Sequence, residues 1–578
     1  MEEPPMGIAY IVAYLKRFEW IDLTVPFISC SSNNPPLENL LSEKQYDVVC
    51  TGGMFVYHRF YMKFFELARK YQKNALKVLG GPIVGALNYD ELFRYLNIDI
   101  AIKGEGENTL LTLLKELYEN QYFTSEINGL IYKNEKNEII ITKEALPIDL
   151  DELNINPDWS WYEYSEVLQK KYSENERHKF NRMPILASRG CPNKCDFCHS
   201  PFSKVRKRTV EDIINEIKYL KSTYKNDRLV FMDETFTANS RRMIELCETL
   251  IKEKINVQWS CGVRTNLINL EVLHLMKRAG CEAIQLGIES GSQDVLNRMN
   301  KNTTIENNLN AVILIRKAKI RPMISVMFGY EDETYEELQS TIDFLIEVNE
   351  LPEYMSHTTP VPGAPLYDRT LKKGLINVNN TYEYIDNMNA GIYLTKRPFL
   401  NLTKIPNNIY WQTLLEAKQR LYTTLAHNNK AIIIEESVVL EDTRLNLKIE
   451  CPHCNCIKNI SQKFRWISKH FCTKCDRYMW LHLNNVSFLK RSYLDIENMI
   501  NNTIHSKKEI VVKAITPEGM QNLYSIFYHV PWKKLWQNVV YVNSLHTFLY
   551  FESINMNSTE YTIFDIDNFS YVSGYQQC

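Results

Sequence analysis

Long hydrophobic runs are absent from this chain of 578 residues. No stretch reaches the roughly 18 to 20 apolar residues that a membrane-spanning helix needs, and the N-terminus lacks the basic and then apolar segments of a secretory signal peptide. An excess of one charge is absent as well, because 67 Lys and Arg residues face 69 Asp and Glu residues, for a formal net charge of −2. We therefore expect a cytoplasmic protein with neither a membrane nor a nucleic acid as its partner.

A disulfide framework is absent too. The 14 cysteines fall into groups with the spacing of metal ligands instead of spreading evenly along the chain, which indicates a reducing compartment. The hydrophobic share of 45% and the charged share of 24% are ordinary for a globular protein. Because the chain is too long for a single hydrophobic core, we expect three or four domains.

Three short apolar runs, separated by segments with helical periodicity, lie within residues 1–125. They cover residues 47–53, 76–82 and 98–107. This alternation predicts an α/β domain with a doubly wound parallel sheet, in which a ligand binds at the carboxyl ends of the strands. The turns at these ends contain Gly52, Gly53, Gly80, Gly81, Gly104 and Glu105. Residues 126–180 are predicted to be a connector with a hairpin around residues 134–138.

Three cysteines stand close together at Cys191, Cys195 and Cys198, in the spacing CxxxCxxC. Iron–sulfur clusters are normally held by four thiolates, so three thiolates on one loop leave one iron of a four-iron cluster open. Either a distant fourth ligand or a substrate then occupies this iron. A zinc site and three unrelated cysteines are the alternatives.

Residues 181–400 repeat a unit of a strand followed by a helix. Six such strands follow one another, beginning with a buried strand at residues 184–188. The residues that come after the later strands are polar or small, namely Asp233, Glu234, Arg264, Glu289, Ser290, Gly329, Pro362 and Gly363. Barrel enzymes place their chemistry at the carboxyl ends of strands, so these residues are candidates for a binding site. For each acid or arginine among them, the alternative is a solvated side chain or a structural ion pair.

The loop at residues 189–198, at the end of a strand, resembles the cluster-binding loop of the radical S-adenosylmethionine (SAM) superfamily. The sequences at residues 3–10, 80–82 and 104–109 resemble the cobalamin (B12)-binding domain that precedes many radical SAM cores. Two features depart from that domain: the strand that usually comes before its first turn is missing, and there is no DxHxxG, the motif that supplies a lower axial His to cobalt in other cobalamin folds. The resemblance implies a Rossmann-like cobalamin-binding domain followed by a partial (β/α)6 TIM-like barrel. A domain that serves only packing or dimerisation is the alternative.

The resemblance also implies roles for these residues. Cys191, Cys195 and Cys198 would bind a [4Fe-4S] cluster whose open iron is chelated by SAM, and Phe197 would shield the cluster. The implied SAM contacts are Asp233 and Glu234 at the amino group, Arg264 at the carboxylate, Glu289 and Ser290 at the ribose, and Gly329, Pro362 and Gly363 where the backbone approaches closely. The implied cobalamin contacts are Gly52, Gly53, Gly80, Gly81, Gly104 and Glu105.

Two pairs of cysteines mark the C-terminal part. Residues 401–445 are predicted to form a helical cover for the barrel, and residues 446–485 contain Cys451, Cys454, Cys472 and Cys475. Two CxxC pairs at this separation predict a zinc ribbon with a structural, tetrahedral zinc site. An auxiliary iron–sulfur cluster is the alternative, with Cys456 and His453 as spare ligands. Residues 486–578 are predicted to form a small α/β unit of the βαβ type, without the GxGxxG sequence of a dinucleotide site.

The family resemblance implies a cobalamin-dependent radical SAM enzyme. Such an enzyme cleaves SAM reductively to a 5′-deoxyadenosyl radical, and we expect this one to methylate an unactivated carbon of a small-molecule substrate. It would need an electron donor such as flavodoxin or ferredoxin. The alternatives are a radical SAM cyclase, oxidoreductase or rearrangement enzyme without methyl transfer, and a zinc-ribbon interaction protein with a degenerate barrel. A methylthiotransferase acting on transfer RNA is disfavoured, because the N-terminal region lacks a three-cysteine cluster set of its own.

Overall fold

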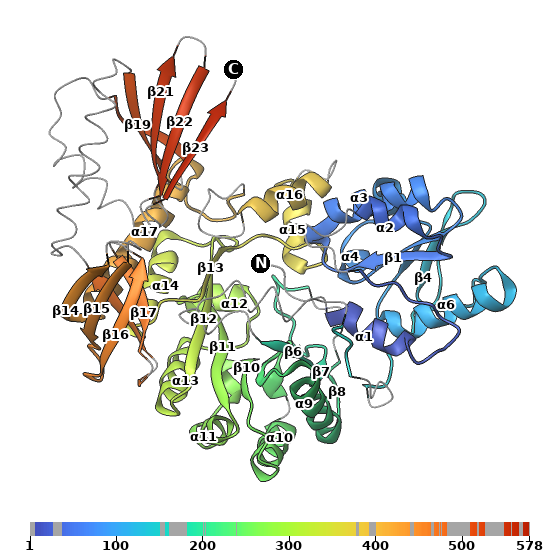
Figure 1. The fold of residues 1–578 in the computed structure, drawn as a ribbon, viewed down its shortest axis with the longest axis horizontal. Coiled ribbons are helices and arrows are strands. Elements are labelled where there is room, and N and C mark those ends of the chain that lie inside the picture. The colour runs from blue at the N-terminus through green and yellow to red at the C-terminus, as the bar shows by residue number, and fades with distance from the viewer. Residues whose placement is uncertain are drawn as a thin grey trace. The chain divides into compact units, whose positions relative to one another are not determined.

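The protein is described from a computed structural model (Figure 1). The structure describes residues 6–26, 37–150, 156–160, 182–199, 202, 204–238, 240–376, 381–391, 400–439, 444–463, 467–472, 474–475 and 477–482, and five strands between residues 509 and 576. The second half of the predicted connector, residues 161–180, lies outside these ranges, as do residues 3–5. The chain divides into two compact units. The first comprises Met1–Gly287, Asn297–Thr303 and Thr359–Asn389, and the second comprises Ile288–Leu296, Thr304–Thr358 and Ala390–Cys578.

A five-stranded mixed sheet forms the N-terminal part of the first unit. Its strands, in spatial order, are β1 (Val48–Gly52), β2 (Leu76–Gly80), β3 (Ile100–Ile102), β4 (Leu130–Lys133) and β5 (Ile139–Ile141). The first three strands are parallel, as predicted. The predicted hairpin around residues 134–138 is present, but β4 pairs antiparallel with β3, so this hairpin extends the sheet instead of belonging to a separate connector. The reason is burial, because Leu130 and Ile131 have no exposed surface.

Helices pack around this sheet (Figure 1). They are α1 (Met6–Leu15), α2 (Leu37–Glu43), α3 (His58–Tyr71), α4 (Pro82–Ala86), α5 (Tyr89–Leu96) and α6 (Gly106–Asn120), with a 3-10 turn η1 (Phe55–Tyr57) before α3. The interior of β2 and all of β3 are buried, the pattern of parallel strands that are covered on both faces. The first residues that the structure describes form α1, whose Ala9 and Tyr10 are buried.

A second sheet of six strands has the order β13-β12-β11-β10-β9-β6. Its strands are β6 (Met183–Ile185), β9 (Arg228–Phe231), β10 (Gln258–Val263), β11 (Cys281–Glu289), β12 (Arg321–Phe328) and β13 (Tyr354–His357). Neighbouring strands from β6 through β11 are parallel, and so are β12 and β13. The prediction of six successive strands in an α/β fold is confirmed.

Several helices of this region begin at polar capping residues. They are α9 (Val210–Tyr224), α10 (Ser240–Lys252), α11 (Leu270–Arg278), α12 (Gln293–Arg298), α13 (Ile305–Lys317), α14 (Tyr335–Glu347), α15 (Pro365–Lys372), α16 (Thr381–Gly391) and α17 (Asn407–Asn428), with the 3-10 turns η3 (Phe236–Ala238) and η4 (Thr265–Leu267). Thr209 caps α9 as expected, since its hydroxyl accepts from the Asp212 N–H at 3.3 Å. Thr334 and Glu337 form a capping box at the start of α14.

The C-terminal part is rich in antiparallel strands. It contains β14 (Ile432–Val439), β15 (Arg444–Glu450), β16 (Ile457–Lys463), β17 (Ile467–Phe471) and β18 (Tyr478–His482), and then β19 (Glu509–Thr516), β20 (Gly519–Ser525), β21 (Phe548–Asn555), β22 (Ser558–Asp565) and β23 (Ser570–Gln576). The last five strands form one antiparallel sheet, so the prediction of a βαβ unit is wrong. Residues 519–525 form the strand β20, and periodicity does not separate a helix from a strand in so short a run.

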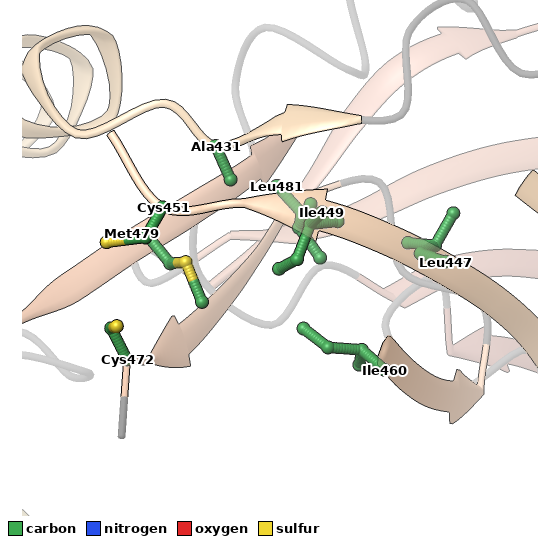
Figure 2. Packing of buried hydrophobic residues seen from close by; sticks show 8 residues of the cluster. All are labelled: Ala431, Leu447, Ile449, Cys451, Ile460, Cys472, Met479 and Leu481. Carbon is green, nitrogen blue, oxygen red and sulfur yellow. The ribbon is translucent and has the colours of Figure 1, made fainter. Parts of the chain in front are cut away.

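The strands β14 to β18 surround a small apolar core (Figure 2). Its buried members are Ala431, Leu447, Ile449, Cys451, Ile460, Cys472, Met479 and Leu481. Two of the eight are metal-ligand candidates, so few apolar side chains are left to hold this region together. Among the helices that the structure describes, none combines the length and the hydropathy that a membrane span requires.

Candidate functional site

The loop that carries Cys191, Cys195 and Cys198 is closed at its base. A two-residue antiparallel ladder joins β7 (Ser188–Arg189) to β8 (Arg206–Lys207). Inside it, the Cys191 N–H donates to the Phe202 carbonyl at 3.0 Å. Gly190 has φ +97, and a Cβ there would stand 2.3 Å from the Lys204 carbonyl oxygen, so only glycine fits.

The middle of the loop is held by residues from two distant segments. Both Asp196 carboxylate oxygens accept from Arg369 of α15, at 2.7 and 2.6 Å. The Asp196 N–H donates to the Met299 carbonyl at 2.9 Å. The Asn300 side chain donates to the Lys194 carbonyl at 2.7 Å. These contacts fix the backbone on both sides of Cys195.

Polar groups lie beside the first cysteine of the loop. Cys191 Sγ lies 3.3 Å from Asn193 Nδ2 and 3.6 Å from Thr235 Oγ1. Burial raises the pKa of Cys198 to about 11, with further contributions from the neighbouring Cys195, Glu234 and Cys191. Three thiols brought together in this way become thiolates when a cationic centre binds them, which is the chemistry of a cluster site.

The spacing of the sulfurs separates a cluster from a single metal ion. Among the described residues, one group of three or more possible ligand atoms lies within 4.8 Å of one another, and it is the C-terminal cysteine group. At least one pair of the loop sulfurs is therefore farther apart than 4.8 Å. A cluster spreads its thiolates over different irons, whereas a single tetrahedral ion draws them together. The loop thus fits a cluster better than it fits zinc.

Two of the predicted SAM contacts in the first unit reach the loop or its entrance. The Arg264 guanidinium lies 3.8 Å from Cys195 Sγ and also donates to the Lys301 carbonyl. Asp233 is buried, and its carboxylate accepts from the Ala187 N–H at 3.0 Å and from the Ser188 hydroxyl. Burial raises the pKa of Asp233 although these hydrogen bonds oppose the shift.

The remaining predicted residues of the first unit lie close by. Glu234, next to Asp233, is exposed. Phe197 has the Lys301 ammonium 5.7 Å from its ring centroid. Pro362 is buried, and the Gly363 carbonyl oxygen lies 3.2 Å from His199 Nδ1. A Cβ on Gly363 would stand 2.6 Å from that ring, so this turn requires glycine.

Three predicted residues belong to the second unit. Glu289 ends β11 with φ +63 and is 8% exposed, a strained backbone of the kind that concentrates at functional sites. Ser290 is fully buried, and its hydroxyl lies 3.1 Å from the Thr341 hydroxyl. Gly329 has φ +85, and a Cβ there would meet the Tyr410 hydroxyl at 2.0 Å. All three follow the carboxyl ends of strands, as the sequence predicted.

The predicted cobalamin-contacting glycines line the carboxyl ends of β1, β2 and β3. A Cβ on Gly52 would stand 2.4 Å from the Gly80 carbonyl oxygen, and a Cβ on Gly81 would stand 2.5 Å from the Gly53 nitrogen. The first two turns therefore pack backbone against backbone. Beside Gly80 and Gly104, in contrast, a Cβ would meet no atom of the described residues within 4 Å. The turns leave room for a ligand at these two glycines.

Two side chains of this domain that could bind a metal, His58 and Glu105, lie next to charged residues. His58 is 1% exposed, and its Nε2 lies 3.3 Å from Asp386. The carboxylate of Glu105 pairs with Arg189 and Arg206. The domain therefore fits a cobalamin without a protein His or carboxylate ligand from these two positions.

The four C-terminal cysteines form a compact metal-ligand group. Cys451 and Cys475 have their sulfurs 3.7 Å apart, and those of Cys454 and Cys472 are 3.6 Å apart. Four thiolates at tetrahedral positions about 2.3 Å from zinc lie about 3.8 Å from one another. The observed distances match a single tetrahedral ion.

Neither spare ligand of this region belongs to the group. His453 Nε2 lies 3.0 Å from the Tyr478 carbonyl oxygen, and burial lowers the pKa of His453. Cys456 directs its sulfur to the Ile457 carbonyl at 3.6 Å. The group therefore consists of four cysteines alone, and Figure 2 shows Cys451 and Cys472 at the edge of the apolar core.

Sequence reasoning missed several residues around the cysteine loop. These are Asn193, Asp196, Thr235, Asn300, Lys301 and Arg369. Asp196 was detectable as a charge between two ligands. Arg369 and Asn300 were not, because nothing in the local sequence shows that segments 100 or more residues away fold back onto the loop.

The comparisons with known proteins agree with this site. The model of the radical SAM superfamily matches residues 185–345, which include all three loop cysteines. This part of the chain is therefore similar to the radical SAM superfamily. The chain is also similar to an uncharacterized methyltransferase of Pyrococcus horikoshii, with 27% identity over 66% of this chain and 81% of the relative. It is also similar to the anaerobic magnesium-protoporphyrin IX monomethyl ester cyclase of Rubrivivax gelatinosus, with 29% identity over 63% of this chain and 66% of the relative.

A third relative and two solved structures of radical SAM proteins extend the comparison. The bacteriochlorophyllide d C-12(1)-methyltransferase of Chlorobaculum tepidum is 31% identical over 37% of this chain, and the match spans less than half of that protein, 46%. The cobalamin-dependent radical enzyme OxsB superposes with a TM-score of 0.56 at 19% identity, covering 72% of this chain and 64% of that one. The methyltransferase TsrM of Kitasatospora setae superposes with a TM-score of 0.53 at 16% identity, covering 64% and 74%. At these identities the superpositions show a shared fold.

Proposed function

We propose that this radical SAM enzyme depends on cobalamin and methylates an unactivated carbon of a small molecule. The observation that carries the proposal is the loop of three cysteines, closed at its base and pinned by Asp196, within the matched radical SAM region. Two of the relatives named above are methyltransferases by name. The intact loop argues against an interaction protein with a degenerate barrel.

The protein's own residues bind and orient the reactants. Cys191, Cys195 and Cys198 would hold the cluster, and Arg264, 3.8 Å from Cys195, is suited to meet a carboxylate next to it. The Asp233 carboxylate already accepts hydrogen bonds from Ala187 and Ser188 at the loop entrance. Its neighbour Glu234 is therefore the better candidate to bind the SAM amino group. When bound, the cluster, SAM and cobalamin supply an electron, a 5′-deoxyadenosyl radical and a methyl group.

The family resemblance implies that Glu289, Ser290 and Gly329 also contact SAM. Glu289 ends β11, Ser290 follows it, and Gly329 follows β12. Glu289 has a left-handed backbone and carries a carboxylate, an acceptor suited to ribose hydroxyls. Gly329 keeps its turn free of a side chain.

The N-terminal domain would bind cobalamin at the open space beside Gly80 and Gly104. Doubly wound sheets bind their ligands at the carboxyl ends of the strands, where these glycines lie. The cluster also needs an electron donor, for which we propose a flavodoxin or a ferredoxin. The grouping of the cysteines favours a reducing cytoplasm as the setting.

A cyclase without methyl transfer is the second candidate, because one relative of comparable similarity is a monomethyl ester cyclase. The two functions differ in the product. Methylation adds one carbon that originates from SAM, whereas cyclisation or oxidation adds none. Product mass with methyl-labelled SAM distinguishes them.

The test of the proposed function uses the full chain, reconstituted without oxygen with iron, sulfide and cobalamin. We expect about four loop-bound irons per chain, a cobalamin absorption spectrum and production of 5′-deoxyadenosine from SAM after reduction. Cys191→Ala should abolish 5′-deoxyadenosine production. Production that survives this replacement refutes the cluster assignment.

For the C-terminal four-cysteine group, we propose a structural zinc ion. The sulfur spacing of 3.6 to 3.7 Å supports one tetrahedral ion over an auxiliary cluster. A closed set of four thiolates leaves no open position for a substrate, so the ion's role is to stabilise a core of eight residues. We expect metal analysis to find one zinc ion per chain in addition to the loop-bound iron.

A further inference from the structure

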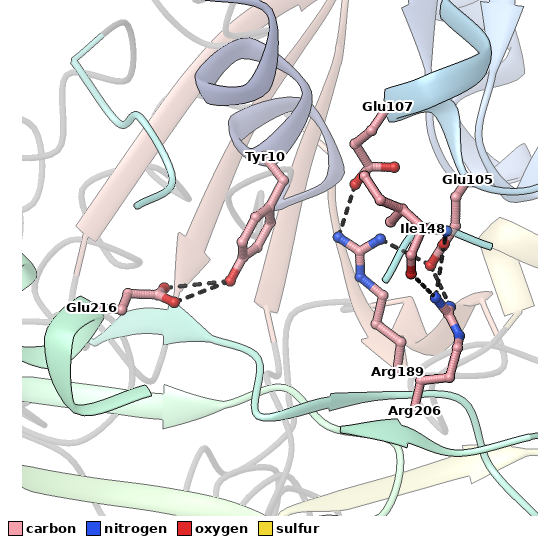
Figure 3. A network of polar contacts seen from close by, with 7 residues as sticks. All are labelled: Tyr10, Glu105, Glu107, Ile148, Arg189, Arg206 and Glu216. Atoms are coloured by element: carbon pink, nitrogen blue, oxygen red, sulfur yellow. Dashed lines mark hydrogen bonds and ion pairs between the residues drawn. The ribbon is translucent and has the colours of Figure 1, made fainter. Parts of the chain in front are cut away.

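The turn between β3 and α6 reaches the base of the cysteine loop (Figure 3). One oxygen of the Glu105 carboxylate accepts from Arg189 at 2.9 Å and from Arg206. The other accepts from Arg206 at 3.0 Å and from the Ile148 N–H at 3.0 Å. Glu107 accepts from the second terminal nitrogen of Arg189 at 2.8 Å. One turn of the N-terminal domain therefore holds two guanidinium groups of the loop base.

The two arginines need this carboxylate because they face each other. Arg189 and Arg206 are directly paired in the ladder of β7 and β8, which has only two residue pairs among the described residues. Like charges at directly opposite positions destabilise an antiparallel pair. The ladder closes residues 190–205, which contain all three cluster cysteines. Repulsion between the arginines would open the loop at its base if no anion lay between them.

The network is buried and balanced in charge. The exposed fractions of the side chains are 7% for Glu105, 4% for Glu107, 14% for Arg189 and 23% for Arg206. Burial by itself raises the pKa of Glu105, but hydrogen bonds and charges from Arg206 and Arg189 outweigh it, so its pKa lies below the ordinary value. Glu105 is thus ionised at neutral pH. Removing one member of such a buried set leaves a charge without compensation.

We infer that Glu105 is a positioning residue for the iron–sulfur cluster. Through Arg189 and Arg206 it holds the base of the cluster-binding loop against the N-terminal domain, and its carboxylate is not a cobalamin contact. The inference rests on the proposed function, in that the loop must hold a cluster. Through these side-chain contacts, the domain proposed to bind cobalamin would help the loop to retain its cluster.

The test compares cluster retention with cobalamin affinity in the reconstituted full chain. Glu105→Gln should accelerate the loss of iron to a chelator by at least about tenfold, as expected for breaking a buried ion pair, while the Kd for hydroxocobalamin stays within about twofold of the wild-type value. Glu105→Asp, which keeps the charge on a shorter side chain, should lie in between. The double variant Glu105→Gln/Arg206→Gln removes both charges, leaves Arg189 with Glu107, and should restore most of the retention.

The matched control is Glu350→Gln. Glu350 pairs with Arg316 of α13, and the exposed fractions of 7% and 23% equal those of Glu105 and Arg206. This variant breaks an equally buried pair that includes no residue of the loop or of its ladder, so its rate of iron loss should equal that of the wild type. Zinc content, measured in every sample, reports whether the rest of the chain is folded.

Three results would overturn the inference. Iron loss from Glu105→Gln at the wild-type rate would remove the link to the cluster, and equal acceleration in Glu350→Gln would show a general loss of stability. A weaker cobalamin affinity with unchanged iron retention would make Glu105 a cobalamin contact. Failure of the proposed function is a separate outcome, because it would already appear as wild-type protein without a cluster or without SAM cleavage.

Discussion

Lys418 offers a prediction whose size and pH dependence follow from the structure. It lies on α17, between the buried Leu414 and Leu421, and is 5% exposed. Burial lowers the pKa of this lysine from 10.5 to about 8. At 1.36 kcal/mol per pKa unit, this shift corresponds to about 3 kcal/mol of stability lost when the ammonium is charged in the folded protein.

The sign of the pH dependence follows from proton binding. Below pH 8 both the folded and the unfolded chain carry the proton, so the folded state bears the full cost of burying the charge. Between pH 8 and 10.5 the unfolded chain binds more protons than the folded one, so stability rises with pH. Above 10.5 the cost is gone. Lys418→Met should therefore stabilise the protein by about 1 to 3 kcal/mol at pH 7, and this gain should shrink towards pH 10.5.

The assay is urea unfolding of the wild type and the variant at several pH values between about 6.5 and 10.5, with the difference in unfolding free energy as the result. Lys430→Met is the matched control, because Lys430 is exposed, and we expect no change from it. A Lys418→Met protein that is less stable than the wild type at pH 7, or a difference that does not vary with pH, refutes the reasoning.

Three further predictions concern the two metal sites. Gly190→Ala should lower the iron content sharply, because the new Cβ would stand 2.3 Å from a carbonyl oxygen. The control Gly374→Ala, at φ +70 with no described atom within 4 Å of the new Cβ, should keep the iron. Equal iron in both variants contradicts the steric argument. Asp196→Asn should speed iron loss by about three- to tenfold. This effect is smaller than the one expected for breaking a fully buried ion pair, because the arginine partner is 39% exposed. An unchanged rate of iron loss would show that the pair does not hold the loop. Cys451→Ser should remove the C-terminal zinc and Cys456→Ser should not, by metal analysis; zinc loss from the second variant would contradict the assignment of the four ligands.

The sequence predicted those features that depend on local pattern. The cysteine spacing, the six strands of the second sheet and the position of polar residues after them could be read directly, because strand ends and metal-ligand spacings leave short-range signals. The C-terminal four-cysteine group was predicted for the same reason, and the structure brings its sulfurs together.

The prediction failed at residues 509–576, where short apolar runs do not distinguish a helix from a strand, and the structure has an antiparallel sheet. The hairpin at residues 134–138 was predicted, but its membership in the N-terminal sheet was not. Which strand a hairpin pairs with depends on long-range packing, and a single sequence carries little information on it.

By itself, the sequence determined the resemblance to the radical SAM superfamily, the two cysteine groups that we propose as metal sites and the strand-end positions of the candidate cofactor contacts. Only the tertiary structure decided what the charged residues near them do. Glu105 follows a strand end of the N-terminal sheet like a ligand-binding residue, yet the fold places it between Arg189 and Arg206 at the base of the cysteine loop. Residues about 100 positions apart meet there, and the Glu105 carboxylate compensates the charges of two largely buried arginines in one ladder. The two arginines come to lie opposite each other only when the chain has folded, so the local sequence does not show this role.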